Sequence, residues 1–212
     1  MEIVVKPSQA VDNNSILNNS STVICLKVCG HLFHKHCMHE TLQKTSPKCP
    51  TCRKPLCEPV GKMPSGSMTI ECKSNLSCAG YEGLKVWVIR YTFPSGIQKA
   101  YHDSPGLPYG STSRTAYLPD TNEGRDLLKR LKYAFTHGLT FTIGTSLTSG
   151  RPNVITWASI HHKTNLGHMR HKGHNRSSGG TNSVHGYPDV GYFFNCNEEL
   201  DALGVPAAAD CP

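Results

Sequence analysis

Apolar residues recur from residue 84 onward with spacings that predict a mixed α and β architecture. Residues 84–93 are β-branched or aromatic on both alternations, which is typical of a strand buried on two faces. Residues 139–145 alternate between apolar and polar side chains, and residues 154–160 supply a returning strand after a turn through Gly150 and Pro152. These last two segments therefore predict a β-hairpin.

Two other segments carry helical spacing. Asp120 and Glu123 resemble a capping box at the start of the first helix, and Gly138 stands where a left-handed C-terminal cap is expected. A second apolar stripe predicts a helix over residues 192–203, which Gly204 ends. The stripe of the first helix consists of Leu127, Leu128, Leu131, Ala134 and Phe135.

Stretches without periodicity divide these elements. Residues 101–116 contain clusters of Gly, Pro and Ser and are expected to form a loop. Residues 166–184 have no large apolar stripe and are expected to form a flexible insertion. The expected organisation is a disordered segment or truncated finger loop over residues 1–24, a zinc finger over 25–57, a linker over 58–68 and an α+β domain over 69–212.

Composition narrows the classes of protein to consider. The 212 residues carry a net charge of +7 without any block of Lys and Arg, so nucleic-acid binding is not expected. No apolar stretch has the length that crosses a bilayer, so membrane insertion is not expected either. Ten cysteines could indicate a secreted disulfide framework, but five of them cluster between Cys25 and Cys52. We therefore expect zinc ligands in a reducing compartment, the cytoplasm or also the nucleus.

Six candidate metal ligands lie within two dozen positions of the first half of the chain. They form three pairs with the spacings Cys-x-His, His-x-x-Cys and Cys-x-x-Cys. Zinc requires four nitrogen or sulfur ligands in a tetrahedral arrangement, and a Cys-x-x-Cys turn supplies two thiolates to one ion without strain. Three correctly spaced pairs argue against a chance grouping of buried cysteines and scattered histidines. The pairs are Cys29 with His31, His34 with Cys37, and Cys49 with Cys52.

The order of these pairs resembles the RING finger in its two-histidine form. The resemblance implies a cross-brace, in which the second and fourth ligand pairs hold one zinc ion, and a short helix over residues 38–44. Residues 1–24 contain no cysteine, and Cys25 stands alone, so the chain is expected to start inside the finger and to bind one zinc ion firmly. The complete site then consists of Cys29, His31, Cys49 and Cys52, and the incomplete one of His34 and Cys37.

Three polar clusters stand out in the expected α+β domain. Residues 144–146, Gly-Thr-Ser, follow a predicted strand directly, where backbone N–H groups can receive phosphate oxygens. The other two are His-His-Lys-Thr at residues 161–164 and His-Gly-Tyr-Pro-Asp at residues 185–189. A hairpin tip and two surface loops are the alternative interpretation. A further alternative is a histidine-rich metal site formed from His161, His162, His168, His171, His174 and His185.

These clusters and their neighbours make the chain resemble the deltex family of RING-type ubiquitin-protein ligases. The motifs are Tyr-Leu-Pro-Asp, Phe-Thr-Ile-Gly-Thr-Ser, Trp-x-x-Ile-His-His-Lys-Thr and His-Gly-Tyr-Pro-Asp, and the resemblance runs from about Cys29 to Leu203. It implies an α+β architecture in which a small zinc-bound RING-type finger precedes a deltex C-terminal domain that binds ADP-ribose or NAD. It also implies transfer of ubiquitin to substrates and to a hydroxyl of ADP-ribose.

The resemblance assigns roles to individual residues. The phosphates of ADP-ribose or NAD are expected beside Gly144, Thr145 and Ser146, and the ribose and adenine beside His161, His185 and Tyr187. The catalytic pair is expected to be His185 and Glu199, with Glu198 as the alternative to Glu199. The sequence departs from the family pattern at Val184, where the family has Gly, and in the extra residues between Thr164 and His185.

The implied partners are a ubiquitin-conjugating enzyme charged with ubiquitin, ADP-ribosylated substrates and Notch-pathway proteins. Pro50 and Arg53 match positions at which a RING finger contacts the conjugating enzyme and ubiquitin, although Arg53 can also be a solvated charge. Such a finger accelerates transfer by holding the thioester-linked ubiquitin in a reactive pose. The alternative function is a non-enzymatic ADP-ribose-binding adaptor, because the first zinc-ligand pair is missing.

Overall fold

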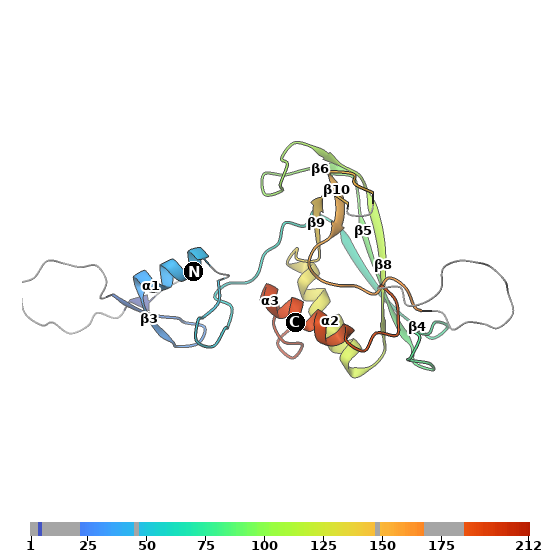
Figure 1. Cartoon of the computed structure of the whole chain (residues 1–212), viewed down its shortest axis with the longest axis horizontal. Helices are drawn as coiled ribbons and strands as arrows, with labels where there is room; N and C mark the ends of the chain where they lie inside the picture. The colour runs from blue at the N-terminus through green and yellow to red at the C-terminus, as the bar shows by residue number, and fades with distance from the viewer. Residues whose placement is uncertain (1–3, 6–21, 45–46, 147–148, 168–184) are drawn as a thin grey trace, which may run out of the picture. The chain divides into compact units, whose positions relative to one another are not determined.

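The computed structural model describes residues 4–5, 22–44, 47–146, 149–167 and 185–212 (Figure 1). It divides the chain into two compact units, Met1–Pro59 and Val60–Pro212, which are described separately below. The insertion expected over residues 166–184 falls outside the described residues except for Leu166 and Gly167. Among the described residues, no helix combines the length and the apolar character needed to cross a bilayer.

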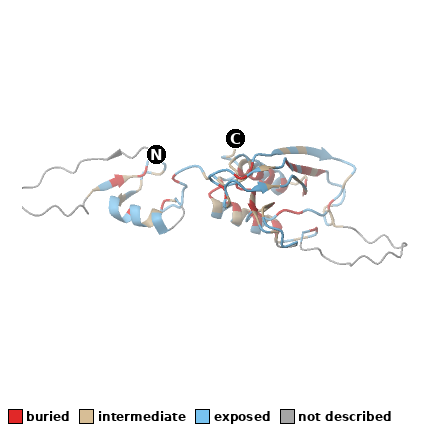
Figure 2. Ribbon diagram, turned by 90° about the horizontal axis from the view of Figure 1, so that it is seen from above, coloured by how far each residue is buried: buried red, intermediate tan, exposed pale blue. Residues whose placement is uncertain are grey.

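The first unit is a small antiparallel sheet followed by one helix. Its core consists of a few buried side chains, among them Ile24 and Met38, and Met38 is the one residue of the helix that is buried. Figure 2 shows the burial of each described segment along the ribbon. The helix begins at Lys35, three residues before the expected start at Met38, so that it includes Cys37. The elements are β1 (Val4–Val5), β2 (Val23–Cys25), β3 (Leu32–His34) and α1 (Lys35–Lys44), with the strand order β1-β2-β3.

The second unit is an α+β domain, as expected. A three-stranded antiparallel sheet and two short hairpins lie with two helices, α2 (Asn122–Thr136) and α3 (Tyr192–Leu203). The three-stranded sheet has the order β4-β5-β8 and consists of β4 (Ser67–Lys73), β5 (Val86–Phe93) and β8 (Thr112–Pro119). The hairpins are β6 (Gly96–Ile97) with β7 (Pro108–Tyr109), and β9 (Phe141–Gly144) with β10 (Val154–Trp157).

Two expectations about irregular segments were wrong. The loop expected over residues 101–116 contains β7 and most of β8, whose polar sequence gives no apolar period and is ordered by pairing with β5, with Ile89 opposite Ala116. Most of the linker expected over residues 58–68 already belongs to the domain, which begins at Val60. Its Gly61 N–H donates to the His137 carbonyl at 2.8 Å, and β4 begins at Ser67. In both segments, hydrogen bonds to residues far away in the sequence determine the structure.

The central strand β5 and the β9–β10 hairpin confirm two of the predicted elements. In β5 the side chains of Val86, Val88 and Ile89 are buried, whereas Arg90 and Thr92 are exposed, so burial on both alternations holds only for the first half of the strand. The half-buried alternation expected for β9 is also observed. These segments were predictable because β-branched and aromatic side chains cover both of their faces or alternate regularly.

Helix α2 has the predicted apolar stripe but a different N-cap. Thr121, not Asp120, caps the helix, since its Oγ1 accepts a hydrogen bond from the Gly124 N–H at 3.0 Å. The Asp120 carboxylate instead accepts from Trp87 Nε1 at 2.9 Å and from Arg125 at 2.6 Å. At the other end Gly138 has φ +72°, the left-handed conformation expected for this position.

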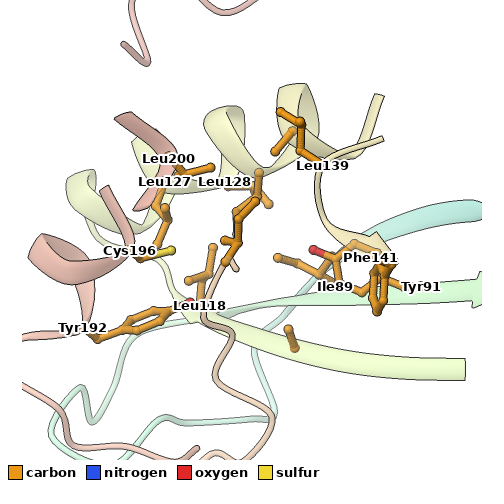
Figure 3. Close-up of a cluster of buried hydrophobic side chains, with 14 of the residues drawn as sticks. Ile89, Tyr91, Leu118, Leu127, Leu128, Leu139, Phe141, Tyr192, Cys196 and Leu200 are labelled. Carbon is orange, nitrogen blue, oxygen red and sulfur yellow. The ribbon is translucent and has the colours of Figure 1, made fainter. Parts of the chain in front are cut away.

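The core of the domain lies between the sheet and the two helices (Figure 3). Leu127 of α2, Leu200 of α3 and Ile89 of β5 are fully buried there. Around Tyr91 the core is aromatic, with the rings of Phe141 at 5.0 Å and of Trp157 at 5.5 Å between centroids. Edge-to-face aromatic pairs of this kind add about 0.5–1.5 kcal/mol each to their burial.

A buried arginine fastens α2 to α3. Arg130 is 5% exposed, and its guanidinium donates to Asp201 Oδ1 at 2.5 Å and to Asn197 Oδ1 at 2.5 Å. It also donates to the backbone carbonyls of Val205 and Pro206, at 3.1 and 3.0 Å, just beyond the end of α3. Since most of the guanidinium donors have partners, the charge is buried without being left unsatisfied.

Replacing Arg130 by Leu should lower the free energy of unfolding of the domain by about 2–4 kcal/mol, because several carbonyl and carboxylate partners lose their donor. Both tryptophans of the chain, Trp87 and Trp157, lie in the second unit, so tryptophan fluorescence during denaturant unfolding of the full chain reports on this domain. The exposed neighbour Lys129→Ala is the control, expected to change stability by less than about 0.5 kcal/mol. Equal effects of the two substitutions would contradict the role of Arg130.

Candidate functional site

Four metal-ligand side chains of the finger meet at one point. The ligand atoms of Cys29, His31, Cys49 and Cys52 all lie within 4.8 Å of one another, and this group is the one such group among the described residues. Gly30, with φ +74°, forms the turn between the first two ligands, and the Leu26 N–H donates to the His31 carbonyl at 2.9 Å across it. Two loops that are separate in sequence thus bring four ligands to one point.

The chemistry of this set fits zinc. Three sulfurs and one imidazole are a common structural zinc environment. Burial raises the pKa of the Cys49 thiol, but hydrogen bonds from the backbone of Cys52 and Thr51 outweigh this effect, and the pKa falls to about 6. The thiolate is the form that binds metal, so the loop favours the ligating state of Cys49.

The other predicted ligands are not part of this group. His34 ends β3 and Cys37 lies in the first turn of α1, and both are exposed. Cys25 contacts the Gly30 carbonyl through its sulfur at 3.5 Å. Within the described residues the finger therefore presents one complete set of four ligands.

The two residues expected to contact the conjugating enzyme lie at the last ligand pair, Pro50 between Cys49 and Cys52 and Arg53 directly after Cys52. Pro50 and Arg53 are both exposed. Arg53 has φ +60°, and its N–H donates to the Cys49 carbonyl at 2.8 Å, which closes the metal-binding loop. A left-handed arginine is uncommon and is held here by the loop, with its side chain directed away from the core.

The second unit contains a polar cleft of about 430 Å³. Its walls come from the chain after β10 and, more than twenty residues later, from the loop before α3 and from α3 itself. The cleft brings together three of the residues assigned by resemblance, His161, His185 and Glu199. The lining residues are His161, His162, Lys163, His185, Asp189, Tyr192, Asn195, Glu198 and Glu199.

Successive side chains of residues 161–163 have different surroundings. His161 is exposed at the cleft, whereas His162 and Lys163 are 6% and 4% exposed. The His162 ring stacks on Trp157 at 4.2 Å, its Nδ1 lies 3.0 Å from the Ile160 carbonyl, and its Nε2 lies 2.9 Å from the Tyr91 hydroxyl. A carbonyl only accepts, so Nδ1 carries the proton and Nε2 accepts from Tyr91. Burial in these surroundings lowers the pKa of His162 to about 4.

Lys163 joins the cleft wall to the start of α3. Its Nζ donates to Asp189 Oδ2 at 2.5 Å and lies 5.3 Å from the centre of the Tyr192 ring. The hydrogen bond from Lys163 lowers the pKa of Asp189, and the other carboxylate oxygen accepts from the Gly191 N–H at 3.0 Å. The sequence motifs contained Lys163 and Asp189, but only the fold showed that they pair.

His161 is held by Glu199. The His161 backbone N–H donates to Glu199 Oε2 at 2.8 Å, and its Nδ1 contacts Glu199 Oε1. His185 lines the same cleft, and its carbonyl accepts from the Thr164 N–H at 2.9 Å. Glu198, the alternative to Glu199, also lines the cleft but is exposed.

Tyr187 lies in the interior instead of lining the cleft. It is 4% exposed, and its hydroxyl donates to the Tyr117 carbonyl at 2.9 Å. Its ring packs edge-on against Tyr81 and Tyr192, with centroids 5.7 and 6.0 Å away. In this arrangement Tyr187 braces the loop that carries His185.

The expected phosphate-binding residues lie at the end of β9. Gly144 pairs with Val154, and a Cβ placed on Gly144 would meet only the Thr156 hydroxyl, at 3.9 Å. Neither the backbone conformation nor packing therefore requires glycine at this position. The Ser146 N–H donates to the Arg151 carbonyl at 2.9 Å, so it is not free for a phosphate, contrary to expectation.

The histidine-rich metal site receives no support from the described residues. His161 and His162 direct their rings to different environments, and no metal group that includes His185 is found in the described part of the chain. His168, His171 and His174 lie outside the described residues.

Two known protein families match this chain, one in each of its two units. The Deltex C-terminal domain family matches residues 60–205, and the Ring finger domain family matches residues 15–53. The fold and its two sites thus define a RING-finger protein with a Deltex C-terminal domain. The chain belongs to the deltex family.

Three curated relatives carry names of ubiquitin ligases. The chain is 42% identical over 181 residues to the probable E3 ubiquitin-protein ligase DTX3 of Homo sapiens and, equally, to that of Mus musculus. These alignments cover 85% of this chain and 48% of each relative. It is 36% identical over 187 residues to the E3 ubiquitin-protein ligase DTX1 of Homo sapiens, covering 85% of this chain and 28% of the relative. The chain therefore spans about half the length of the first relatives.

The Cys/His group predicts the zinc content of the chain. After dialysis at neutral pH the full chain should retain about one equivalent of zinc, and Cys52→Ser should lose it because three protein ligands hold the ion more weakly than four. Cys37→Ser, which lies outside the group, is the matched control and should keep the metal. Two equivalents in the unchanged chain, with one lost in Cys37→Ser, would show a second site at His34 and Cys37.

Neutral, buried His162 predicts a loss of stability in mild acid. Below its ordinary pKa of 6.5 the unfolded chain takes up a proton that the folded domain refuses until about pH 4, so folding weakens as the pH falls through this window. His162→Gln keeps a donor and an acceptor but does not titrate. The difference in unfolding free energy between the unchanged chain and this variant should fall by about 2–3 kcal/mol from neutral pH to pH 4. A pH-independent difference would contradict the neutral state.

Proposed function

We propose that this chain acts as the catalytic module of a ubiquitin ligase, binding a ubiquitin-conjugating enzyme through its finger and ADP-ribose or NAD through its C-terminal domain. The ligase names of the relatives support the first part. The observation that carries the second part is the cleft, which brings His161 together with His185 and Glu199 from a later part of the chain.

The finger acts by positioning. Zinc bound by Cys29, His31, Cys49 and Cys52 would cross-link two loops and so fix the surface that carries Pro50 and Arg53. The exposed Arg53 guanidinium can donate to the conjugating enzyme and to ubiquitin at once, because it has five N–H donors in a planar fork. Holding the thioester in one pose lowers the entropic part of the barrier to transfer.

The cleft suits a ligand with hydroxyl groups. Its lining combines imidazoles, carboxylates and a lysine, which can bind ribose hydroxyls more readily than an apolar group. The unfilled space beside Gly144 leaves room for a bulky group to approach the end of β9. We propose that the domain recruits ADP-ribosylated substrates in this way and that ubiquitin is also transferred to a hydroxyl of ADP-ribose.

The cellular context belongs to the same proposal. Membership of the deltex family supports a role in the Notch pathway and in the cytoplasm, or also in the nucleus. Co-precipitation of Notch-pathway proteins with the full-length protein and imaging of the tagged protein would test these two points.

Titration of the full chain with ADP-ribose by calorimetry should give a dissociation constant in the micromolar range. This corresponds to a binding free energy of about −8 kcal/mol. His161→Ala should weaken binding roughly tenfold, because a hydrogen-bonding ring at the cleft is lost. Asp126→Asn, an exposed change on α2, should bind like the unchanged chain. Absence of heat at millimolar ligand would refute ADP-ribose binding.

The ligase activity is measured in parallel with a conjugating enzyme charged with ubiquitin. The full chain should accelerate discharge of ubiquitin, and Arg53→Ala should slow it. Binding of ADP-ribose without any acceleration of discharge would favour the adaptor, in which the finger has only a structural role.

A further inference from the structure

The three-stranded sheet carries a second polar pocket, of about 250 Å³, on the face opposite to Ile89 and Tyr91. Its lining residues are different from those of the cleft. All three strands contribute to it, and the register places Arg90 of β5 between Thr69 of β4 and Thr115 of β8. The polar residues of the lining are Thr69, Glu71, Lys73, Arg90, Thr115 and Tyr117.

The charges in this pocket leave one cation over. Lys73 Nζ lies 2.5 Å from Glu71 Oε2, and this contact, with a smaller contribution from the Arg90 charge, lowers the pKa of the Glu71 carboxyl. Arg90 is exposed, and no described residue forms a hydrogen bond or an ion pair with its guanidinium. Two cations and one carboxylate leave a single positive charge, flanked by the hydroxyls of Thr69 and Thr115. The pocket therefore suits a singly charged anion, such as a carboxylate, better than a phosphate dianion.

The strand that forms one wall of the pocket has an unpaired edge. β4 lies at the end of the sheet, and within the described residues it pairs with β5 alone (Figure 1). In the same part of the chain, Ser67–Lys73 makes no main-chain hydrogen bond outside that pairing. At the other edge of the sheet the Tyr117 N–H donates to the Lys163 carbonyl at 2.8 Å. Alternate N–H and C=O groups of an edge strand point away from the sheet, so β4 can receive a further strand.

The side chains of β4 define what such a strand would carry. Met68 and Ile70, on either side of Thr69, are half-buried and pack against the core of the domain. An added strand would place one residue opposite each of these three, with side chains on alternating faces. Apolar side chains are favoured beside Met68 and Ile70. The residue between them lies on the face of the pocket, and because Thr69 is small, the long side chain of Arg90 can reach across it to a carboxylate there.

We propose that the pocket and the free edge of β4 form a docking site for an extended segment of a partner protein with the pattern apolar-acidic-apolar. The segment adds to the sheet as a fourth strand, next to β4. Its main chain bonds to the edge of β4 and supplies most of the affinity, and the pairing of its carboxylate with Arg90 supplies the specificity. The site lies apart from the cleft, so it does not depend on the binding of ADP-ribose.

The test uses ¹H–¹⁵N spectra of the full, ¹⁵N-labelled chain during titration with the peptide acetyl-Thr-Val-Glu-Val-Thr-amide. The amides of Ser67–Lys73 and of Arg90 should shift, whereas those of the cleft residues His161 and Glu199 should not. The matched peptide with Gln in place of Glu should bind roughly tenfold more weakly, because it lacks the charge-assisted hydrogen bonds to Arg90. N-methylation of the three central residues should abolish binding, because it removes the donors of the added strand.

Variants of the chain show whether Arg90 is the partner of the carboxylate. Arg90→Gln should weaken binding of the Glu peptide roughly tenfold but leave binding of the Gln peptide nearly unchanged, since the two losses share one contact. Arg90→Lys keeps the charge and should bind more tightly than Arg90→Gln. Arg114→Gln, an exposed change on the opposite face of β8, is the matched control and should bind like the unchanged chain. The midpoint of denaturant unfolding, followed by tryptophan fluorescence, confirms that each variant is folded.

Four outcomes would overturn the proposal. The first two are equal affinities for the Glu and Gln peptides, and no shift at millimolar peptide. The third is that sodium acetate shifts Arg90 as strongly as the peptide does while Ser67–Lys73 stays unchanged, which would assign the pocket to free carboxylates. The fourth is broadening of the Ser67–Lys73 amides as the concentration of the chain rises without peptide, which would assign the edge to a second copy of the chain.

Discussion

The buried imidazole of His162 is the constraint on which the cleft depends. Its Nε2 accepts a hydrogen bond from the Tyr91 hydroxyl of the central sheet, and its Nδ1 donates one to the Ile160 carbonyl. The ring also stacks on Trp157 at the end of the hairpin. An unpaired polar group in such a place would cost several kcal/mol, so the ring has one allowed position. His162 is thus held in the interior while its neighbour His161 is exposed at the cleft.

Helix α3 is the other half of this arrangement, and polar contacts place it. Arg130 binds the end of the helix through Asp201 and Asn197, and Lys163 binds its start through Asp189. Each pair would be costly to break, because the buried cation, Arg130 or Lys163, would lose its carboxylate partner. The helix is thereby fixed at both ends, and Glu199 between them meets His161.

The finger is held together in a different way from the C-terminal domain. The described part of the finger has few buried side chains, and a metal ion bound where Cys29, His31, Cys49 and Cys52 converge would add a cross-link between its loops. The metal-binding loops then carry Pro50 and Arg53 on their outer surface. The part of the finger that would meet another protein is thus the part that the metal orders.

The sequence by itself determined the local features: the four zinc ligands with their spacing, the apolar stripe of α2, the hairpin, and the family motifs. Each of these features depends on the spacing of residues that are close together in the sequence, and that spacing can be recognised without a structure. Only the tertiary structure decided that β8 is a strand, that Tyr187 is a brace, and that Glu199 clamps His161. These depend on contacts between residues far apart in the chain, where pairing and burial override local propensity.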